Sequence, residues 1–419
     1  MALALTEEER AWAAGESVVP AIALATRIVA ETARFLGAER LVPVTSTHID
    51  GCLYHGDSGT AFAEKLVTDQ GRVRVPSTLN VGALDLLNPM RVRGDRHHYE
   101  MALRMMRAYE ALGCQPTWTC APYQAGHRPG LGEHVAWGES NAVAFCNSVL
   151  GARTNRYGDF LDICAAISGR APYAGLHLTE NRRASIVLET SAISPALKDT
   201  DVFYPVLGAI LGREAGTAVV VVDGLPKGVS EDRLKALGAA AASTGAVGLF
   251  HVAGTTPEAS TLEAALAGQP PVKIVNVTPD MVRRSRDSLS TVTAERIDAV
   301  AVGSPHFSEE EVVELERLLG GRTFAVPFYV CTRRDVVEML KRERRLKPLE
   351  DAGVVIVADT CVVVTPILPE GGGVLMTNSG KFAHYAPGNT GWEVVYGSLG
   401  DCVASALTGR VARDERLWQ

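Results

Sequence analysis

Residues 119–156 read TCAPYQAGHRPGLGEHVAWGESNAVAFCNSVLGARTNR, and this stretch decides the fold. An apolar run over residues 115–119 predicts a strand that ends at Cys120, and the pattern over residues 139–150 predicts a helix. Between them lies a loop rich in Gly and Pro. A strand that crosses into a helix through a glycine-rich loop is typical of an open α/β sheet.

The same stretch is also the first candidate site. It carries a thiol, histidines and guanidiniums, namely Cys120, His127, His134, Arg153 and Arg156. In open α/β sheets, ligands bind where the loops at strand carboxyl ends meet helix N-termini. The alternative interpretation is a polar surface loop, but such a loop usually carries Lys and Glu instead of metal-ligating and anion-binding side chains.

Composition excludes several classes of protein. The chain has 419 residues and a net charge of −7, which does not favour nucleic acid or an anionic membrane as the main partner. Its start is acidic and unlike a signal peptide, and no apolar run reaches the roughly 18 residues of a membrane span. Eight scattered cysteines without a CxxC pair indicate reduced thiols. We therefore expect a cytoplasmic protein.

A second polar loop follows the strand expected near residues 41–46. It reads THIDGCLYHGDSG over residues 47–59 and contains His48, Asp50 and Cys52. A histidine close to an aspartate can act as an oriented general acid or base. The alternative is that His48 and Asp50 only hold the turn.

From residue 201 onward, strand-length apolar runs alternate with helical patterns. The runs span residues 217–222, 247–251, 272–277, 299–302, 324–328 and 354–357. This alternation predicts an α/β architecture with parallel, buried strands. We expect three domains, at residues 1–195, 196–290 and 291–419.

Three strand ends in this half are polar. They read GSPHFS at residues 303–308, ADTC at 358–361 and TNSGK at 377–381. A phosphate-binding loop would need Ser or Thr after the lysine, but Phe382 follows Lys381. Nucleotide binding is therefore not expected.

Six motifs in order along nearly the whole chain, STHIDGCLYHGDSG, TCAPYQ, WGESNAVAFCNSVLGARTNR, GSPHFSEEE, ADTC and TNSGKFAHY, resemble the aconitase X family of the aconitase superfamily. The resemblance implies three α/β/α domains around a central cleft, an iron–sulfur cluster and dehydratase chemistry. The family also has a swivelling domain with a catalytic serine, fused or separate. The alternating pattern uses this whole chain, so the resemblance implies a small partner subunit.

The resemblance also implies roles for individual residues. Cys120 and Cys361 are the foremost candidates for cluster ligands. Three residues are candidates for the third ligand: Cys52, which we favour, Cys331 and Ser304. Many relatives carry cysteine where this chain has Ser304, so the number of irons, two or four, is also open. Catalytic roles fall to His48, Asp50 and Lys381. The expected substrate-binding residues are Ser58, Ser140, Asn141, Arg153, Asn155 and Arg156.

The implied reaction is removal of water from cis-3-hydroxy-L-proline to give Δ1-pyrroline-2-carboxylate, because the HIDGCLYHG, CAPYQ and GSPHF motifs resemble the bacterial branch. Dehydration needs a Lewis acid for the hydroxyl, a base for the Cα proton and cations for the carboxylate. Two alternatives remain open. One is a dehydratase of a phosphorylated hydroxy acid such as phosphomevalonate, and the other is a non-catalytic cluster-binding subunit.

Overall fold

The computed structural model describes residues 3–418, which divide into two compact units. The first unit comprises residues 1–84 and 94–183, and the second comprises residues 85–93 and 184–419. Residues 85–93 thus belong by their contacts to the carboxyl-terminal unit. The amide of Leu86 donates to Asp359 Oδ2 (3.2 Å), and the amide of Arg93 donates to the carbonyl oxygen of Pro366 (2.7 Å).

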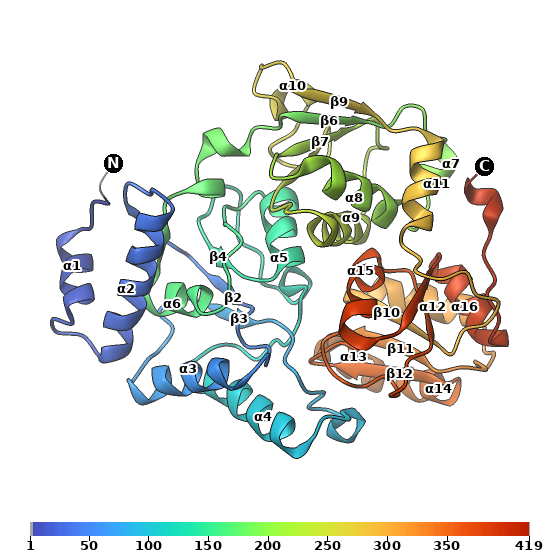
Figure 1. Ribbon diagram of the computed structural model, residues 1–419, viewed down its shortest axis with the longest axis horizontal. Helices are drawn as coiled ribbons and strands as arrows, with labels where there is room; N and C mark the ends of the chain where they lie inside the picture. Colours follow the sequence, from blue (N-terminus) through green and yellow to red (C-terminus); the bar gives the residue numbers. More distant parts are fainter. Residues whose placement is uncertain (1–2, 419) are drawn as a thin grey trace. The chain divides into compact units, whose positions relative to one another are not determined.

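The first unit is built around a small parallel sheet with strand order β3-β2-β4. Its strands are β2 (Thr47–Ile49), β3 (Ser77–Leu79), β4 (Ala136–Trp137) and the antiparallel pair β1 (Leu41–Pro43) and β5 (Arg170–Pro172). Its helices are α1 (Glu7–Ala14), α2 (Pro20–Phe35), α3 (Asp57–Thr68), α4 (Arg96–Ala111), α5 (Ser140–Phe145) and α6 (Leu161–Ser168). Helices α2 and α6 pack together, as do α3 and α4 (Figure 1).

The opening stretch differs in part from its prediction. The helix expected over residues 139–150 exists as α5 continued by a π-helical turn, Cys146–Leu150. The strand expected over residues 115–119 is wrong, because only Gln115 forms a bridge, to Thr78. Beyond it, the side chain of Thr117 takes both backbone groups of Leu79 (3.0 and 2.8 Å), and Trp118 turns to a φ of 44°. The segment still donates two backbone bonds to β3, from Gln115 to Ser77 (2.7 Å) and from Thr119 to Leu79 (3.1 Å), but the Thr117 side chain and the turn at Trp118 interrupt a regular strand.

The second unit contains two fully parallel sheets, as the alternating pattern predicted. The first sheet has the order β8-β7-β6-β9, and helices α8 and α9 pack against each other beside it (Figure 1). Its elements are β6 (Ile186–Glu189), α7 (Pro195–Lys198), α8 (Phe203–Ala215), β7 (Val220–Asp223), α9 (Glu231–Thr244), β8 (Phe250–Val252), α10 (Leu262–Ala265), β9 (Lys273–Asn276) and α11 (Pro279–Asp287).

The other sheet has the order β12-β11-β10-β13-β14. Its elements are β10 (Ala299–Phe307), α12 (Glu309–Leu319), β11 (Phe328–Thr332), α13 (Arg334–Arg342), α14 (Leu346–Asp351), β12 (Val354–Ala358), β13 (Val374–Thr377), α15 (Gly380–Thr390), β14 (Glu393–Tyr396) and α16 (Leu399–Thr408). Strand β10 is longer than expected and includes the GSPHF motif. Strand β11 begins where the expected run over residues 324–328 ends.

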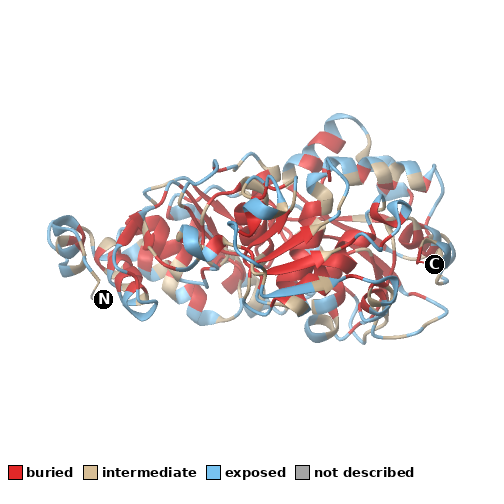
Figure 2. Ribbon diagram, turned by 90° about the horizontal axis from the view of Figure 1, so that it is seen from above, coloured by how far each residue is buried: buried red, intermediate tan, exposed pale blue. Residues whose placement is uncertain are grey.

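Burial follows the pattern of parallel sheets covered by helices, except at the edge strand β9, where three of the four residues are exposed although a buried strand was expected. All nine residues of β10 are buried, and Figure 2 shows buried strands between helices with exposed outer faces. The eight cysteines are free thiols and all are buried, as expected for a chain without a disulfide framework. Within residues 3–418, no helix has the length and apolar character needed to cross a membrane.

Candidate functional site

Strand register aligns side chains from separate motifs in the first unit. His48 on β2 pairs directly with Thr78 on β3 and with Trp137 on β4. Directly paired residues of parallel strands point to the same face of a sheet. Two residues further along each strand stand Asn80, Asp50 and Glu139, at the carboxyl edge where ligands of α/β sheets bind.

The three residues Asn80, Asp50 and Glu139, called the edge row below, include two carboxylates, and Asn80 and Asp50 are hydrogen-bonded. Asn80 Nδ2 donates to Asp50 Oδ1. Burial, and next the carboxylate of Glu139, raise the pKa of Asp50 to about 7. Glu139 itself caps α5 by accepting from the amide of Ala142 (2.7 Å), although its φ of 65° is unfavourable for a residue with a side chain.

Asp162 supports the loop that carries Asp50. Its Oδ2 accepts the amides of Asp50 (2.6 Å) and Gly51 (3.0 Å), and its Oδ1 accepts the amide of Ile163 (2.6 Å). Burial raises the pKa of Asp162 to about 7, although these N–H groups oppose the rise. The sheet edge therefore carries two carboxyl groups that titrate near neutral pH, which is the range useful for proton transfer.

His48 is fully buried and bonds to a neighbouring hydroxyl. Its Nδ1 lies 2.9 Å from Thr78 Oγ1, and His127 Nδ1 lies 2.7 Å from the same oxygen. The rings of His48 and His127 pack against Trp137, with centroids 5.6 and 5.0 Å away. Burial, and next His127, hold the pKa of His48 well below its usual value, so this histidine is neutral.

Cys52 has surroundings that favour a neutral thiol. It is fully buried, and its sulfur donates to the carbonyl oxygens of Ile49 (3.3 Å) and Asn80 (3.4 Å). Burial, and then the carboxylates of Asp50 and Asp162, raise its pKa well above the usual value. In these surroundings Cys52 is a neutral thiol, which would have to lose its proton in order to bind iron.

Cys120 lies at a different kind of position. It retains 6% exposure and stands where the chain leaves the β3 side of the sheet. Its carbonyl oxygen accepts a bond from Asn141 Nδ2 (3.0 Å), and the same nitrogen lies 3.1 Å from the hydroxyl of Tyr123. Asn141 therefore holds the Cys120 loop against α5. Its Oδ1 is buried without a partner among the described residues.

The ARTNR turn is braced by a further histidine. Arg153 donates to the carbonyl oxygen of His177 (3.0 Å) and to Thr179 Oγ1 (2.8 Å). The amide of Asn155 is occupied by the backbone, since it donates to Ala174 (3.0 Å) and accepts from Leu176 (2.8 Å). Arg156 is exposed. Asn155 thus shapes the turn, whereas Arg156 is the guanidinium with more access to solvent.

In the second unit, the ADTC motif forms a strained turn after β12. Asp359 has a φ of 65°, and its fully buried carboxylate is paired with Arg334, whose Nη2 lies 2.9 Å from Oδ2. His306 on β10 bonds through Nε2 to the carbonyl oxygen of Thr360 (3.1 Å). The next residue is Cys361, which retains 8% exposure. The GSPHF and ADTC motifs are therefore in direct contact.

The TNSGK motif meets the same region of β10. Ser379 caps α15 by accepting from the amide of Phe382 (3.0 Å), and its hydroxyl donates to the carbonyl oxygen of Ser304. Lys381 is half-buried on the first turn of α15. Ser304 keeps 8% exposure, whereas Cys331 is fully buried.

Two other expected residues occupy the edges of helices in the first unit. Ser58 is exposed in the first turn of α3, and Ser140 is half-buried beside Glu139. Thr78, Asn80 and Asp162 belong to the site but were not selected from the sequence. Residues 72–81 form a strand-like run in the sequence, and the place of Thr78 and Asn80 within it was the signal that could have found them. For Asp162, the sequence offered only a helix.

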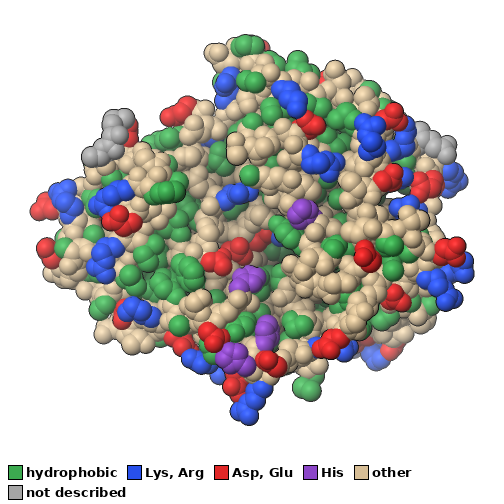
Figure 3. Space-filling model, viewed as in Figure 1, with side chains coloured by type: hydrophobic (Ala, Val, Ile, Leu, Met, Phe, Trp, Pro, Cys, Tyr) green, Lys and Arg blue, Asp and Glu red, His purple; other side chains and the backbone are tan. Residues whose placement is uncertain are grey.

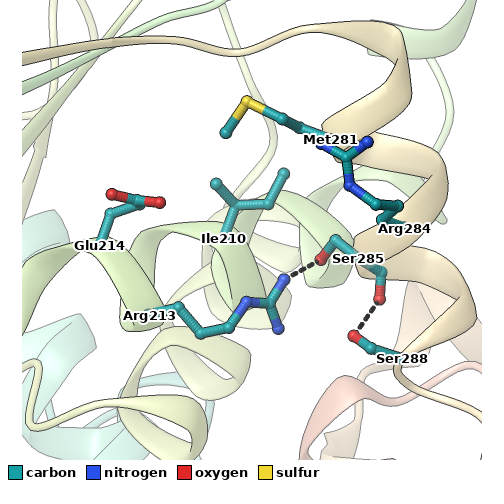
Figure 4. A pocket seen from close by; sticks show the side chains of 7 residues that line it. All are labelled: Ile210, Arg213, Glu214, Met281, Arg284, Ser285 and Ser288. Carbon is teal, nitrogen blue, oxygen red and sulfur yellow. Dashed lines mark hydrogen bonds between the residues drawn. The ribbon is translucent and has the colours of Figure 1, made fainter.

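A well-formed pocket elsewhere contains none of the motif residues. It has a volume of about 300 Å³ and lies between α8 and α11. In Figure 4, Arg213 points toward Ser285, to which it donates (2.6 Å). On the face shown in Figure 3, acidic and basic side chains are interspersed. Among residues 3–418, no three His, Cys, Asp or Glu side chains are grouped as a metal site.

The comparisons with known proteins agree with the motifs. Family models described as the first, second and third domains of aconitase X match residues 2–180, 184–287 and 297–408. The cis-3-hydroxy-L-proline dehydratase of Pseudomonas aeruginosa is 41% identical over 392 residues, which cover 92% of this chain and 67% of that protein. The chain thus spans about two thirds of that relative's length.

An archaeal relative and a solved structure complete the comparison. The phosphomevalonate dehydratase large subunit of Methanothermobacter thermautotrophicus is 38% identical over 364 residues, covering 86% of this chain and 88% of that subunit. The crystal structure of Thermococcus kodakaraensis aconitase X in its holo-form aligns with a TM-score of 0.86 and 32% identity, over 96% of this chain and all of that one. This chain therefore belongs to the aconitase X family, as its six motifs indicated.

Proposed function

We propose that the chain is the large subunit of a dehydratase that removes water from cis-3-hydroxy-L-proline to give Δ1-pyrroline-2-carboxylate. The observation that carries the proposal is the acidic edge row beside a neutral buried histidine, in a chain 41% identical to a dehydratase of that name. Elimination breaks a C–H and a C–O bond. It needs one group that accepts a proton and another that donates one to the departing hydroxyl.

The residues of this chain divide those tasks. His48 and Asp50 hold or move the proton of the leaving hydroxyl, because a neutral imidazole and a carboxyl with a pKa of about 7 can each donate near neutral pH. Arg156 and Arg153 bind the substrate carboxylate. Lys381 is the third catalytic residue, and Ser58, Ser140 and Asn141 contribute polar contacts to substrate. The base that takes the Cα proton is a serine of a small partner subunit, in keeping with the "large subunit" names of the archaeal relatives.

Two thiols fit the iron–sulfur cluster that the family implies. Cys120 and Cys361 keep 6% and 8% exposure, each in a turn stabilised by neighbouring side chains. We favour Cys52 as the third ligand, with Cys331 and Ser304 as the alternatives; the two thiols are fully buried, and Ser304 keeps 8% exposure. Such a cluster supplies a Lewis acid for the leaving hydroxyl.

The test is anaerobic purification followed by iron and sulfide analysis and by turnover of a panel of hydroxyprolines, with and without a small subunit. We expect a brown protein, loss of colour in Cys361→Ala but not in Cys164→Ala, and turnover of cis-3-hydroxy-L-proline only with the partner. Cys164 is a suitable control because it is buried within α6. A colourless, iron-free protein after reconstitution would exclude the cluster, and full turnover by the lone chain would exclude the partner's base.

A phosphorylated hydroxy acid is the second candidate substrate. The archaeal phosphomevalonate dehydratase subunit matches this chain over 88% of its own length, more than the bacterial dehydratase does. The same assay with phosphomevalonate decides between them, since a preference for that substrate would reverse the order of the two proposals.

A further inference from the structure

Three hydrogen-bonding side chains form a continuous row in the first unit. His48 and His127 each place Nδ1 within 3 Å of the single hydroxyl of Thr78, at 2.9 and 2.7 Å. Both bonds are short and lie on the buried face of the sheet. The Nε2 atoms at the two ends of the row are buried and have no partner among the residues that the structure describes.

One hydroxyl proton cannot serve both rings. Thr78 donates it to one Nδ1, so the other ring must carry its own proton on Nδ1 and donate to the oxygen. The two histidines therefore occupy opposite neutral tautomers. One has a bare Nε2, the other has an N–H at Nε2, and reversing the direction of both hydrogen bonds exchanges these two states.

We propose that Thr78 and His127 extend His48 into a proton relay for the dehydration, an inference that rests on the proposed function. His127 is the outer end, because it lies on an irregular segment next to the exposed Gly126 and Arg128, whereas His48 is fully buried on β2. His48 is the inner end, two residues before Asp50 at the carboxyl edge of β2, where Asn80 and Glu139 follow the neighbouring strands.

The proton movements balance. As the C–O bond breaks, His48 Nε2–H gives its proton to the departing hydroxyl, and His48 Nδ1 takes the hydroxyl proton of Thr78. Thr78 takes the Nδ1 proton of His127, and His127 gains a proton at its buried Nε2 from a water that enters beside the exposed Gly126 and Arg128. The proton that the base removed from Cα then returns along the row in the reverse direction. The starting tautomers are restored, and the net products are the unsaturated acid and one water.

Burial explains why the relay uses neutral rings. It lowers the pKa of His127 to about 4 and that of His48 well below its usual value, so an imidazolium is disfavoured at either end. In the relay each ring gains one proton as it loses another, and no net charge has to be buried. Contact with Trp137 holds both rings in place, so the tautomers can exchange without ring rotation.

The test compares Thr78→Val with Thr78→Ser in the active holoenzyme. Valine keeps the shape but removes the hydroxyl, and serine restores it. We expect kcat to fall by about 10²-fold in Thr78→Val, the lower range for general acid catalysis, with KM within about threefold. Thr78→Ser should recover kcat to within about fivefold. Thr47→Val is the matched control, since it removes a buried hydroxyl from the opposite face of the same sheet (Thr47 Oγ1 to Ser77 Oγ, 2.8 Å).

Nitrogen NMR of labelled histidines gives a readout that does not depend on turnover. The wild type should show His48 and His127 as opposite neutral tautomers, and Thr78→Val should remove that pairing while Thr47→Val preserves it. Equal kcat in Thr78→Val and Thr47→Val, or identical tautomers in the wild type, would overturn the relay. A third outcome is a wild type that shows the paired tautomers but turns over no hydroxy acid. The proposed function then fails, and the hydrogen-bonded row exists but has no role in dehydration.

Discussion

Replacing Lys235 by Met tests a buried ionic contact in the second unit. Lys235 on α9 is 1% exposed, and its ammonium lies 2.6 Å from Glu311 Oε2 and 2.7 Å from Asp232 Oδ1. It also donates to the carbonyl oxygen of His306 (3.2 Å). The side chain thus joins α9 to the end of β10 and the start of α12, next to the GSPHF motif.

The expected cost follows from what remains after the ammonium is removed. A hydrogen bond to a charged group contributes about 1.5–3 kcal/mol, so two such bonds together contribute about 3–6 kcal/mol. Both carboxylates keep another partner in Ser308. Glu311 accepts from the backbone amide of Ser308 (2.8 Å), and Asp232 accepts from the hydroxyl of Ser308 (2.6 Å). Their side chains are also 25% and 23% exposed, which lets water replace part of the loss. We therefore expect about 3 kcal/mol of destabilisation.

The assay is equilibrium unfolding in urea, with Lys273→Met as the matched control. Lys273 makes an equally short contact to Glu214 (2.6 Å) but is 51% exposed, so its loss should cost no more than about 1 kcal/mol. The double variant Lys235→Met/Glu311→Gln should be less destabilised than the sum of the single variants, because it removes the uncompensated carboxylate. The reasoning is refuted if Lys235→Met unfolds with the same free energy as Lys273→Met.

Three other predictions concern the motifs. The pKa of Asp50 in the folded chain, about 7, lies above its ordinary value of 3.8, so the stability that this carboxyl contributes is complete below about pH 4 and is lost as the pH rises through 7. Asp50→Asn should therefore flatten the fall in Tm between pH 5 and 8. Parallel Tm curves for the variant and the wild type would contradict this. Gly303→Ala should lower the free energy of unfolding by more than about 3 kcal/mol, measured in urea, because φ is +93° and a Cβ would lie 2.0 Å from the carbonyl oxygen of Cys331. Arg153→Lys keeps the charge but loses the planar fork, and kcat/KM should fall about tenfold, or roughly 1.4 kcal/mol; unchanged kinetics would assign the guanidinium to the turn alone.

The sequence predicted the architecture of the second unit well, for a physical reason. Parallel strands buried on both faces are continuous apolar runs, and short helices between them repeat at regular spacing. The six expected runs correspond to β7–β12, with errors mainly at the boundaries. The error at β10 arose because the GSPHF motif is polar, although it continues as a buried strand whose polar groups are satisfied by His306 and Ser379 contacts.

The first unit was harder to predict because its strands are two or three residues long. The run over residues 115–119 has the composition of a strand and makes two backbone bonds to β3, but the side chain of Thr117 bonds to Leu79 between them, so no regular strand forms. The register that aligns His48 with Thr78 cannot be read from either motif alone. The contacts of residues 85–93 with Asp359 and Pro366, far along the chain, likewise have no signal in the sequence.

Backbone strain marks the loops that carry the proposed chemistry. Glu139 and Asp359 both have a φ of 65°, a conformation that costs a residue with a side chain about 1–2 kcal/mol. In each case the carboxylate of the strained residue makes a specific bond. Glu139 accepts from the amide of Ala142, and Asp359 accepts from the guanidinium of Arg334. Such strain persists only where surrounding contacts over-determine it, and it concentrates at functional sites. The strained residue in WGES directs a helix N-terminus toward the acidic edge row, and the one in ADTC sets the turn on which Cys361 stands. Of the side chains proposed to act, Ser140 and Asn141 lie within two residues of the strained turn in the first unit, and Cys361 lies within two residues of the one at Asp359 in the second.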